Sequence, residues 1–530
     1  MSDDPKHYLT LGWQVTPTLE PTYWLKSDAK PGLQKEDDLV RVPSSSAGSH
    51  TAIIAQSGSG KSFFLGRLIE ELVLNTKARC LILDPNADFR QIHRVEETVW
   101  TPIDKKTGKP VKPHYDLIER GGKLPHEKSR EDFEDRWPTD EILIKGIDQK
   151  GDNFQPLKLW WPDVSVDFFS EGANPVLRSE LYYCHTFVKE LALLIDLKAK
   201  ATKKDIDLLD LAETLLNQSR KPGVDFYAAL QEEFADVRAT VGNAAKEGGL
   251  GLKSVLAWST NLFIRFSVNF AISRASKAPK YVTPEGQRFY FATVNEYNTA
   301  GILETKSKNR PRTSSRVKRV EVIDLPALPN RPTQLLAINA ILKTEWELAR
   351  KDWSDALGKD EKADIRVPTF IVVDEAHNLM PAEPESRAEK ALRDQFRTII
   401  AEGRKYGLFL ILVSQRPDKL DPLIVSECEN KVLMKLSSRA VLDKTRSLLG
   451  LEDIPPKLLD RCLEFELGRA LLLGTWVPRG PQFMYSAPRR TKEGGRNLRK
   501  EHWAVPPVPP DPTAKKKPEP EADNKDKSNK

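Results

Sequence analysis

The 530-residue sequence has few cysteines and no long apolar run. Its four cysteines lie far apart and form no Cys-x-x-Cys pair, which argues against a disulfide scaffold and against a zinc finger. The longest apolar stretches, such as Leu408 to Val413, have the length of a strand and fall far short of the roughly 18 residues that cross a bilayer. The polar, acidic N-terminus is not that of a signal peptide. We therefore expect a cytoplasmic protein that does not bind a membrane.

Neither sign of charge dominates, because 82 Lys and Arg against 76 Asp and Glu leave a net charge of +6. So small an excess does not by itself indicate nucleic acid. Positive charge is clustered instead: residues 305–319 hold seven Lys and Arg and no acid, and residues 489–500 hold six and one Glu. Such clusters favour phosphate contacts through counterion release, and a solvated loop and a basic tail are the alternatives. Trp160 and Trp161 are compatible with base stacking, although core packing is the preferred interpretation.

Short buried-strand patterns alternate with amphipathic helical patterns along much of the chain. The strand patterns are Thr51–Ala55, Cys80–Pro85, Val320–Leu325, Phe370–Val373 and Leu408–Val413. Strands that are apolar throughout favour a parallel sheet covered on both faces, so we predict an α/β fold.

The pattern divides the chain into five segments. Residues 1–48 show no persistent apolar period and are predicted to form an N-terminal arm. The core is predicted in two parts, 49–95 and 320–485, separated by a mainly helical insertion over 96–319 with a basic β/loop end. Residues 486–530 are predicted to be a basic and then disordered tail, because mixtures such as PPVPPDP and KKKPEPE cannot bury a core.

The strongest chemical signal is the sequence AQSGSGKS, which lies between a predicted strand and a predicted helix. A phosphate-binding loop needs glycines that let backbone N–H groups converge, a Lys for the β- and γ-phosphates, and a hydroxyl for Mg²⁺. Ala55 stands where the usual pattern has its first Gly, and Ala can adopt the conformation of a strand end. A Gly/Ser-rich turn with a chance Lys-Ser is the weaker alternative. The candidate ATP-binding residues are Ser57, Gly58, Ser59, Gly60, Lys61 and Ser62.

A second signal is the apolar strand Phe370–Val373, which ends in Asp374 and Glu375. An Asp followed by a second carboxylate suits a metal ligand and a base that polarises water. The same pair could serve as a helix N-cap with an acid in the first turn. The phosphate-binding loop elsewhere in the chain favours the catalytic interpretation.

Several segments in the same order resemble the HerA/FtsK superfamily of ring-forming P-loop ATPases, and HerA-like proteins most closely. They are HTAIIAQSGSGKS, LILDPNAD, VIDLPAL, FIVVDEAHNLMP, EGRKYGLFLILVSQRP and GRALLLG. The resemblance implies a RecA-like core. HerA-like proteins usually carry an N-terminal β-barrel, and we expect no room for one in the 50 residues before the first core strand.

The resemblance also implies roles for single residues. Ser62 and Asp374 would serve Mg²⁺, Glu375 would orient the attacking water, and Gln415 would sense the γ-phosphate. Arg404 resembles an arginine presented across a subunit interface, with a cation at a helix C-terminus as the equal alternative. Asp88 stands where the family often has Glu, and it reaches less far.

The implied function is ATP hydrolysis by a homo-oligomeric ring, expected to be a hexamer, that moves along or opens duplex DNA. A nuclease or another effector is the expected partner, in DNA processing or antiviral defence. The alternative is a nucleotide-dependent scaffold that organises an effector enzyme without translocating DNA. A coupling ATPase that pumps DNA through a secretion channel is disfavoured, because the sequence has no transmembrane pattern.

Overall fold

The computed structural model describes residues 8–15, 39–96, 130–146, 152–159, 165, 167, 280–282, 288–291, 318–328, 331–358, 364 and 366–494. Several predictions fall outside these residues. They are most of the mainly helical insertion predicted over 96–319, including the paired tryptophans and most of the 305–319 cluster, and the part of the predicted tail beyond residue 494.

The described part of the chain is built on a 12-stranded sheet. In sheet order the strands are β2 (Leu39–Pro43), β1 (Tyr8–Gln14), β15 (Gln482–Ser486), β14 (Arg469–Leu473), β13 (Asn430–Leu433), β3 (Thr51–Ile54), β12 (Leu408–Ser414), β11 (Thr369–Val373), β4 (Arg79–Asp84), β10 (Val320–Asp324), β5 (Ile142–Gly146) and β6 (Phe154–Pro156). The strands from β13 to β6 pair in parallel, whereas β14, β15, β1 and β2 continue the sheet antiparallel. The predicted α/β fold with a parallel sheet is confirmed.

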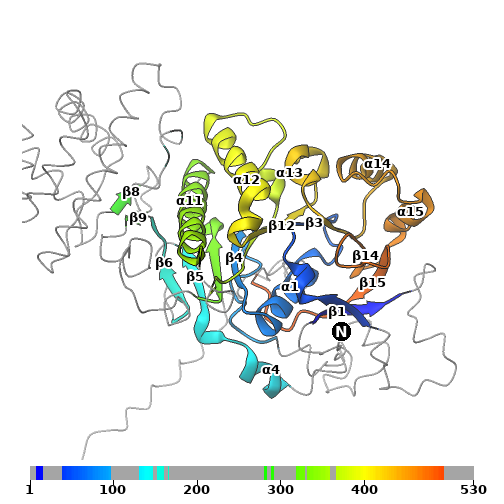
Figure 1. Cartoon of the computed structure of the whole chain (residues 1–530), viewed down its shortest axis with the longest axis horizontal. Helices are drawn as coiled ribbons and strands as arrows, with labels where there is room; N and C mark the ends of the chain where they lie inside the picture. The colour runs from blue at the N-terminus through cyan, green and yellow to red at the C-terminus, as the bar shows by residue number, and fades with distance from the viewer. Residues whose placement is uncertain are drawn as a thin grey trace, which may run out of the picture. The chain divides into compact units, whose positions relative to one another are not determined.

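Helices cover both faces of this sheet. The main ones are α1 (Lys61–Asn75), α4 (Arg130–Arg136), α11 (Arg331–Ala356), α12 (Arg387–Tyr406), α13 (Pro422–Ser426), α14 (Arg439–Leu448) and α15 (Pro456–Glu464). Figure 1 shows α11, α12 and α13 on one side of the sheet and α1 and α4 on the other. A small separate sheet joins β7 (Lys158–Leu159), β9 (Arg288–Phe291) and β8 (Lys280–Val282).

Strand side chains alternate between two buried cores, because successive residues of a strand point to opposite faces. In β3, Ile53 packs in the core beneath α1, while Ile54 packs with the core beneath α11 and α12. The same alternation separates Ile82 from Leu83 in β4. Both faces are therefore apolar, which explains why these strands read as continuous apolar runs rather than as alternating ones.

Two predicted boundaries are corrected by the sheet. Residues 1–48 are not only an arm, because β1 and β2 form one edge of the sheet and bury Leu9, Leu11 and Trp13. The core also does not stop at residue 95, because β5 lies inside the predicted insertion and pairs in parallel with β10. Both additions pair with strands that are distant in the sequence, and a local pattern does not reveal such partners.

The parallel strands place their carboxyl ends along one edge of the sheet. The loop after β3, the loop after β4 and the residues after β11 and β12 all emerge at this edge. In open α/β sheets, ligands bind outside the carboxyl ends of the strands. Within the described residues, no helix combines the length and the apolar character needed to span a membrane.

Candidate functional site

The loop between β3 and α1 has the backbone geometry of a phosphate cradle. Gly58 and Gly60 have positive φ values of 75° and 92°, in the left-handed region that glycine adopts without a steric penalty. Gly60 is the residue that precedes the first turn of α1, so the free N–H groups of this 15-residue helix face the loop. Ala55 has no positive φ, and its N–H donates to the carbonyl of Ser414 at 3.1 Å. The missing first glycine therefore leaves the loop conformation intact.

Of the three predicted serines, Ser57 and Ser59 precede α1 and differ in their surroundings. Ser57 is exposed, whereas Ser59 is buried and its Oγ has no hydrogen-bond partner. The Ser59 carbonyl accepts a hydrogen bond from the N–H of Gly468 at 3.0 Å. This contact ties the loop to the turn before β14, so the loop is held from both sides.

Lys61 joins the loop to the two carboxylates after β11. Its Nζ lies 2.6 Å from Asp374 Oδ1 and 2.5 Å from Glu375 Oε1. The three residues are buried, with exposed fractions of 6%, 1% and 7% respectively. Burial alone would lower the pKa of Lys61, but attraction to Asp374 and then to Glu375 outweighs it and raises the pKa above its usual value. Lys61 is therefore a fixed positive charge at the centre of the site.

Burial raises the pKa of Asp374 above its usual value, and the charge of Lys61 acts against that rise. Asp374 also accepts a hydrogen bond from the Nδ2 amide of Asn86 at 3.3 Å. The cation and the amide keep a buried carboxylate in place directly beside the phosphate cradle.

Glu375 adopts a left-handed conformation with φ of 47°, which is uncommon for a residue other than glycine. Such strain persists only where the surrounding structure imposes it, and it clusters at functional sites. The Nε2 amide of Gln415, directly after β12, donates a hydrogen bond to Glu375 Oε1. His377 lies in the short helical turn Ala376–Asn378, and its Nδ1 is 3.5 Å from Glu375 Oε2.

The loop that follows β4 also contributes to the site. Ser62 Oγ donates to Asp88 Oδ2 at 2.6 Å, so the shorter acid does reach the site. The carboxylate of Asp84 accepts backbone N–H groups from Asn86, Asp88 and Phe89, which folds the loop back on the strand end. Burial raises the pKa of Asp84 to about 7. The sequence marked Asp88 only as a departure from the family pattern and gave no contact for Asp84 or Asn86.

Arg404 lies at the other edge of the sheet. It is in the last turn of α12, before β12 begins, whereas Gln415 directly follows the end of that strand. Seven strand residues at about 3.3 Å each separate them by roughly 20 Å. Arg404 is 59% exposed at its side chain and forms an ion pair with Glu429. It does not contact the phosphate-binding loop of its own chain.

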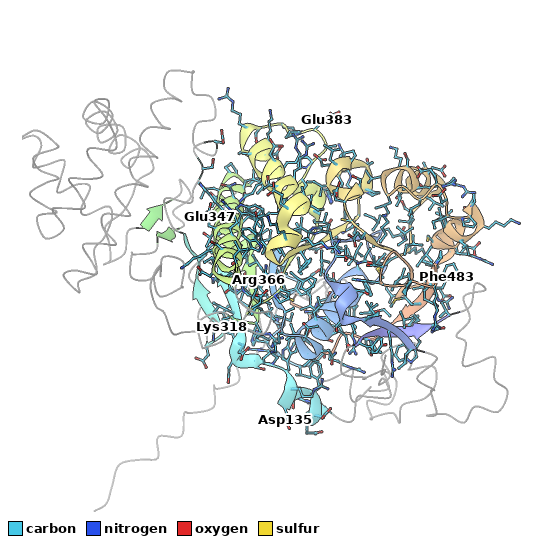
Figure 2. The ribbon with its side chains drawn as sticks, in the orientation of Figure 1. Asp135, Lys318, Glu347, Arg366, Glu383 and Phe483 are labelled. Carbon is cyan, nitrogen blue, oxygen red and sulfur yellow. The ribbon has the colours of Figure 1, made fainter. Side chains whose placement is uncertain are left out.

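Four of the five described Lys and Arg residues in the two basic clusters are held within the structure, and Lys492 is the fifth. Lys318, which is labelled in Figure 2, lies just before β10. Its Nζ donates to the carbonyl of Asp140 at 2.6 Å, and Arg319 donates to carbonyls at the end of α1. Arg489 and Arg490 are buried, so neither is part of an exposed basic tail. These four positive side chains are held by the protein itself rather than presented for phosphate contacts.

The site fits a nucleoside triphosphate with Mg²⁺. The cradle offers N–H groups and Lys61 for phosphate oxygens, and Ser62 offers a hydroxyl with Asp374 and Asp88 nearby. In the described residues, no group of three or more His, Cys, Asp or Glu could hold a metal ion by itself. A metal ion here would therefore depend on Ser62, on phosphate oxygens and on water, which is how Mg²⁺ is usually bound at such sites.

Comparison with known proteins agrees with this geometry. The model of the central domain of helicase HerA matches residues 39–345, and the model of the ATPase family associated with various cellular activities matches residues 337–436. A DNA double-strand break repair helicase HerA of Sulfolobus acidocaldarius is 24% identical over 256 residues, which is 47% of either chain. A probable helicase of Methanocaldococcus jannaschii is 33% identical over 118 residues, which is 22% of either chain. The chain thus spans about half the length of these curated relatives or less.

Among solved structures, the bacterial conjugative coupling protein TrwB matches with a TM-score of 0.40, 13% identity and coverage of 92% of this chain and 94% of that one. VirB4 of Thermoanaerobacter pseudethanolicus gives a TM-score of 0.33 at 14% identity, covering 83% of this chain and 88% of that one. Because these TM-scores and identities are low, the family assignment depends on the sequence match to the family model alone. Since the central-domain match covers more than half of the chain, this protein belongs to the HerA helicase family of ATPases.

Proposed function

We propose that this protein hydrolyses ATP in a ring of identical subunits and couples hydrolysis to movement along or opening of duplex DNA. The observation that carries the proposal is the convergence of Lys61, Asp374 and Glu375 beside a phosphate cradle at the carboxyl edge of a parallel sheet. The curated HerA relatives are named as DNA double-strand break repair helicases, and their similarity to this chain supports DNA as its substrate.

In the proposed reaction, the cradle and Lys61 bind the phosphates and Glu375 activates the attacking water. Glu375 Oε1 accepts hydrogen bonds from both Lys61 and Gln415. Triphosphate oxygens would compete for Lys61, which leaves the Glu375 carboxylate free to accept a proton from water. Gln415 would sense whether a γ-phosphate is bound, because its amide contacts the catalytic carboxylate of Glu375.

Mg²⁺ would be held by Ser62, with Asp374 beside it, and would neutralise charge on the β- and γ-phosphates. The protein's contribution is to fix the Ser62 hydroxyl through Asp88 and to fix Asp374 through Lys61 and Asn86. The position of the hydroxyl therefore depends on the loop after β4 as well as on the phosphate-binding loop.

Arg404 is proposed to act on the nucleotide of a neighbouring subunit. Its place at the far edge of the sheet leaves it out of reach of its own site, while its exposure lets a neighbour approach it. An arginine that stabilises transition-state charge contributes about 10³–10⁵ in rate in other systems. A purely structural Arg404 would instead stabilise the C-terminal end of α12 and pair with Glu429.

Mixed rings test this interface role. Arg404→Ala should bind ATP normally and lose hydrolysis, and Glu375→Gln should do the same for a different reason. A ring that contains both variants has some interfaces with an intact Glu375 on one side and an intact Arg404 on the other, so activity should return. Arg439→Ala is a matched control, because Arg439 is 58% exposed at its side chain and also forms an ion pair with a carboxylate, that of Asp460. Mixed rings that stay inactive would assign Arg404 a role within its own subunit.

DNA dependence decides between a motor and a scaffold. The motor proposal expects the full-length protein to bind duplex DNA, and expects DNA to stimulate its ATPase rate. Salt titration should give a linear fall in log affinity with log salt, at a slope of about 0.9 per phosphate contact. ATP-dependent assembly with neither DNA binding nor DNA stimulation would favour a scaffold that organises an effector enzyme. A nuclease partner and a role in antiviral defence are part of the proposal and would be tested by co-purification.

A further inference from the structure

A short segment after β15 runs through the protein to the nucleotide site. We call residues 487–494 the strap. It begins where the N–H of Ala487 donates to the carbonyl of Leu11 in β1, at 2.8 Å. Thr491 then forms an isolated antiparallel bridge with Val95, and the N–H of Gly494 donates to the carbonyl of Asp88 at 2.9 Å. The strap thus links the sheet edge to the loop after β4.

A buried carboxylate of α1 anchors the middle of the strap. Glu70 Oε1 accepts the backbone N–H groups of Arg490 at 2.8 Å and Thr491 at 2.7 Å. The Glu70 side chain is fully buried, and its partner Arg67 lies one turn earlier on the helix. Two charge-assisted hydrogen bonds in an apolar setting fix the strap firmly to the helix that begins at Lys61.

Arg489 crosses α1 and contacts the loop after β4 directly. Its Nη2 donates to the carbonyls of Asp88 at 3.1 Å and of Lys492 at 3.0 Å, and its guanidinium carbon lies 4.7 Å from the ring centroid of Phe89. The side chain is 1% exposed, and burial lowers the pKa of Arg489. Burying a guanidinium costs desolvation free energy unless the group is hydrogen-bonded, and the carbonyl of Asp88 is one of its acceptors here.

Two glycines make room for this arrangement. A Cβ on Gly66, in the middle of α1, would lie 2.3 Å from Arg489 Cδ. A Cβ on Gly494 would lie 2.0 Å from the carbonyl oxygen of Ala87. Glycine inside a helix is unfavourable relative to Ala, so Gly66 is best explained by the passage of Arg489 across the helix. Ala87 itself has a positive φ of 60°, and strain of this kind needs support from surrounding structure.

We propose that the strap positions the Ser62 hydroxyl for Mg²⁺, with Arg489 as the positioning residue that acts through Asp88. The main chain of Asp88 is held by Arg489 and Gly494, while its carboxylate accepts the Ser62 hydroxyl. The chain of contacts is short and each step is a hydrogen bond between groups that are at least partly buried. The inference rests on the proposed role of Ser62 in holding Mg²⁺, and it assigns part of that site to residues more than 400 positions away.

The main test is a MgCl₂ titration of ATP hydrolysis by the full-length protein. Arg489→Met keeps much of the apolar volume and removes the hydrogen bonds, so half-maximal activity should need roughly tenfold more Mg²⁺. ATP binding measured without Mg²⁺ should be unchanged, and high MgCl₂ should restore most of the rate. Lys492→Met is the matched control, because it removes one positive charge from the same strap but not the contact with Asp88.

Ser62→Ala separates this inference from the proposed function. If Ser62→Ala leaves the Mg²⁺ requirement unchanged, the proposed metal role of Ser62 fails. If Ser62→Ala raises the requirement and a folded Arg489→Met does not, the strap inference is overturned. A rate that falls by the same factor at every Mg²⁺ concentration would also overturn it, because it would indicate a structural role only.

Two further measurements cover a variant that fails to fold. Gly494→Ala should press on the Ala87 carbonyl without leaving a buried charge unpaired, and it should raise the Mg²⁺ requirement in the same direction. In the wild-type protein, a coupling between Mg²⁺ binding and the strap must act in both directions. Adding MgCl₂ to the protein bound to a non-hydrolysable ATP analogue should therefore slow amide hydrogen exchange in residues 487–494. Exchange that does not respond to MgCl₂ would refute the coupling.

Discussion

Replacing Lys61 tests the centre of the site in the absence of any nucleotide. Lys61→Ala removes the cation that pairs with both Asp374 and Glu375 and leaves two carboxylates with exposed fractions of 1% and 7%. Breaking a buried pair by deleting one partner costs about 3–5 kcal/mol, because the remaining charge stays buried. The variant should therefore lose hydrolysis and also be less stable than the wild type before ATP is added.

The loss of stability should depend on pH. The folded-state pKa of Lys61 is raised, so its charge and its stabilising effect are fully present below the unfolded value and persist across the neutral range. Burial already raises the pKa of Asp374, and in the variant the attraction of Lys61 no longer opposes that rise, so Asp374 can lose its unpaired charge by binding a proton as the pH falls. The wild type and the variant should differ most at about pH 8, and the difference should shrink toward about pH 5.5.

Thermal unfolding of the nucleotide-free protein measures this effect. At about 2 °C per kcal/mol for a large domain, the midpoint should fall by roughly 6–10 °C at about pH 8. The double variant Lys61→Ala, Glu375→Gln should recover part of the loss, because one of the two unpaired charges is gone. An unchanged midpoint, or a fall of the same size at both pH values, would refute the buried three-residue pairing.

Three other predictions concern single parts of the protein. Glu375→Gln should keep ATP binding and lower the hydrolysis rate at least about 100-fold, because the amide keeps the shape but not the basicity; normal turnover per bound ATP would remove Glu375 from the catalytic role. Burial raises the pKa of Asp84 from 3.8 to about 7, so the folded state binds an extra proton between these values and stability should fall as pH rises through that window. Asp84→Asn should flatten this dependence in denaturant titrations, and an unaltered slope would contradict it. Changing Lys306, Lys308, Arg310 and Arg312 to Gln should weaken binding to duplex DNA and make its salt dependence shallower, with basal ATPase activity kept; unchanged binding would identify the cluster as a solvated loop.

The phosphate-binding loop and the acidic strand end were predictable because their information is local. Gly58 and Gly60 are needed for a left-handed backbone, and that requirement is met within the eight residues of the loop itself. The strand that precedes Asp374 was equally clear, because an apolar run before two acids can be recognised anywhere in a sequence.

Contacts between distant segments were not predictable from such patterns. The segment Tyr8–Gln14 is too short for its alternation to stand out, and it becomes a strand because β2 and β15 pair with it. Asp88 gains its contact with Ser62 only when two strands lie close together in one sheet. Charge counts suggested that Arg489 and Arg490 belong to an exposed tail, whereas Glu70 and the carbonyl of Asp88 hold this stretch in the interior.

The sequence by itself determined which chemical groups stand together in each motif, because each motif carries its glycines, its lysine or its carboxylates within a few residues. Only the tertiary structure decided which of those groups meet. It brought Lys61 to Asp374 and Glu375 across 313 and 314 positions, and it left Arg404 at the opposite edge of the sheet from its own nucleotide site. The physical reason is that a parallel sheet gathers the carboxyl ends of strands at one edge regardless of their distance along the chain.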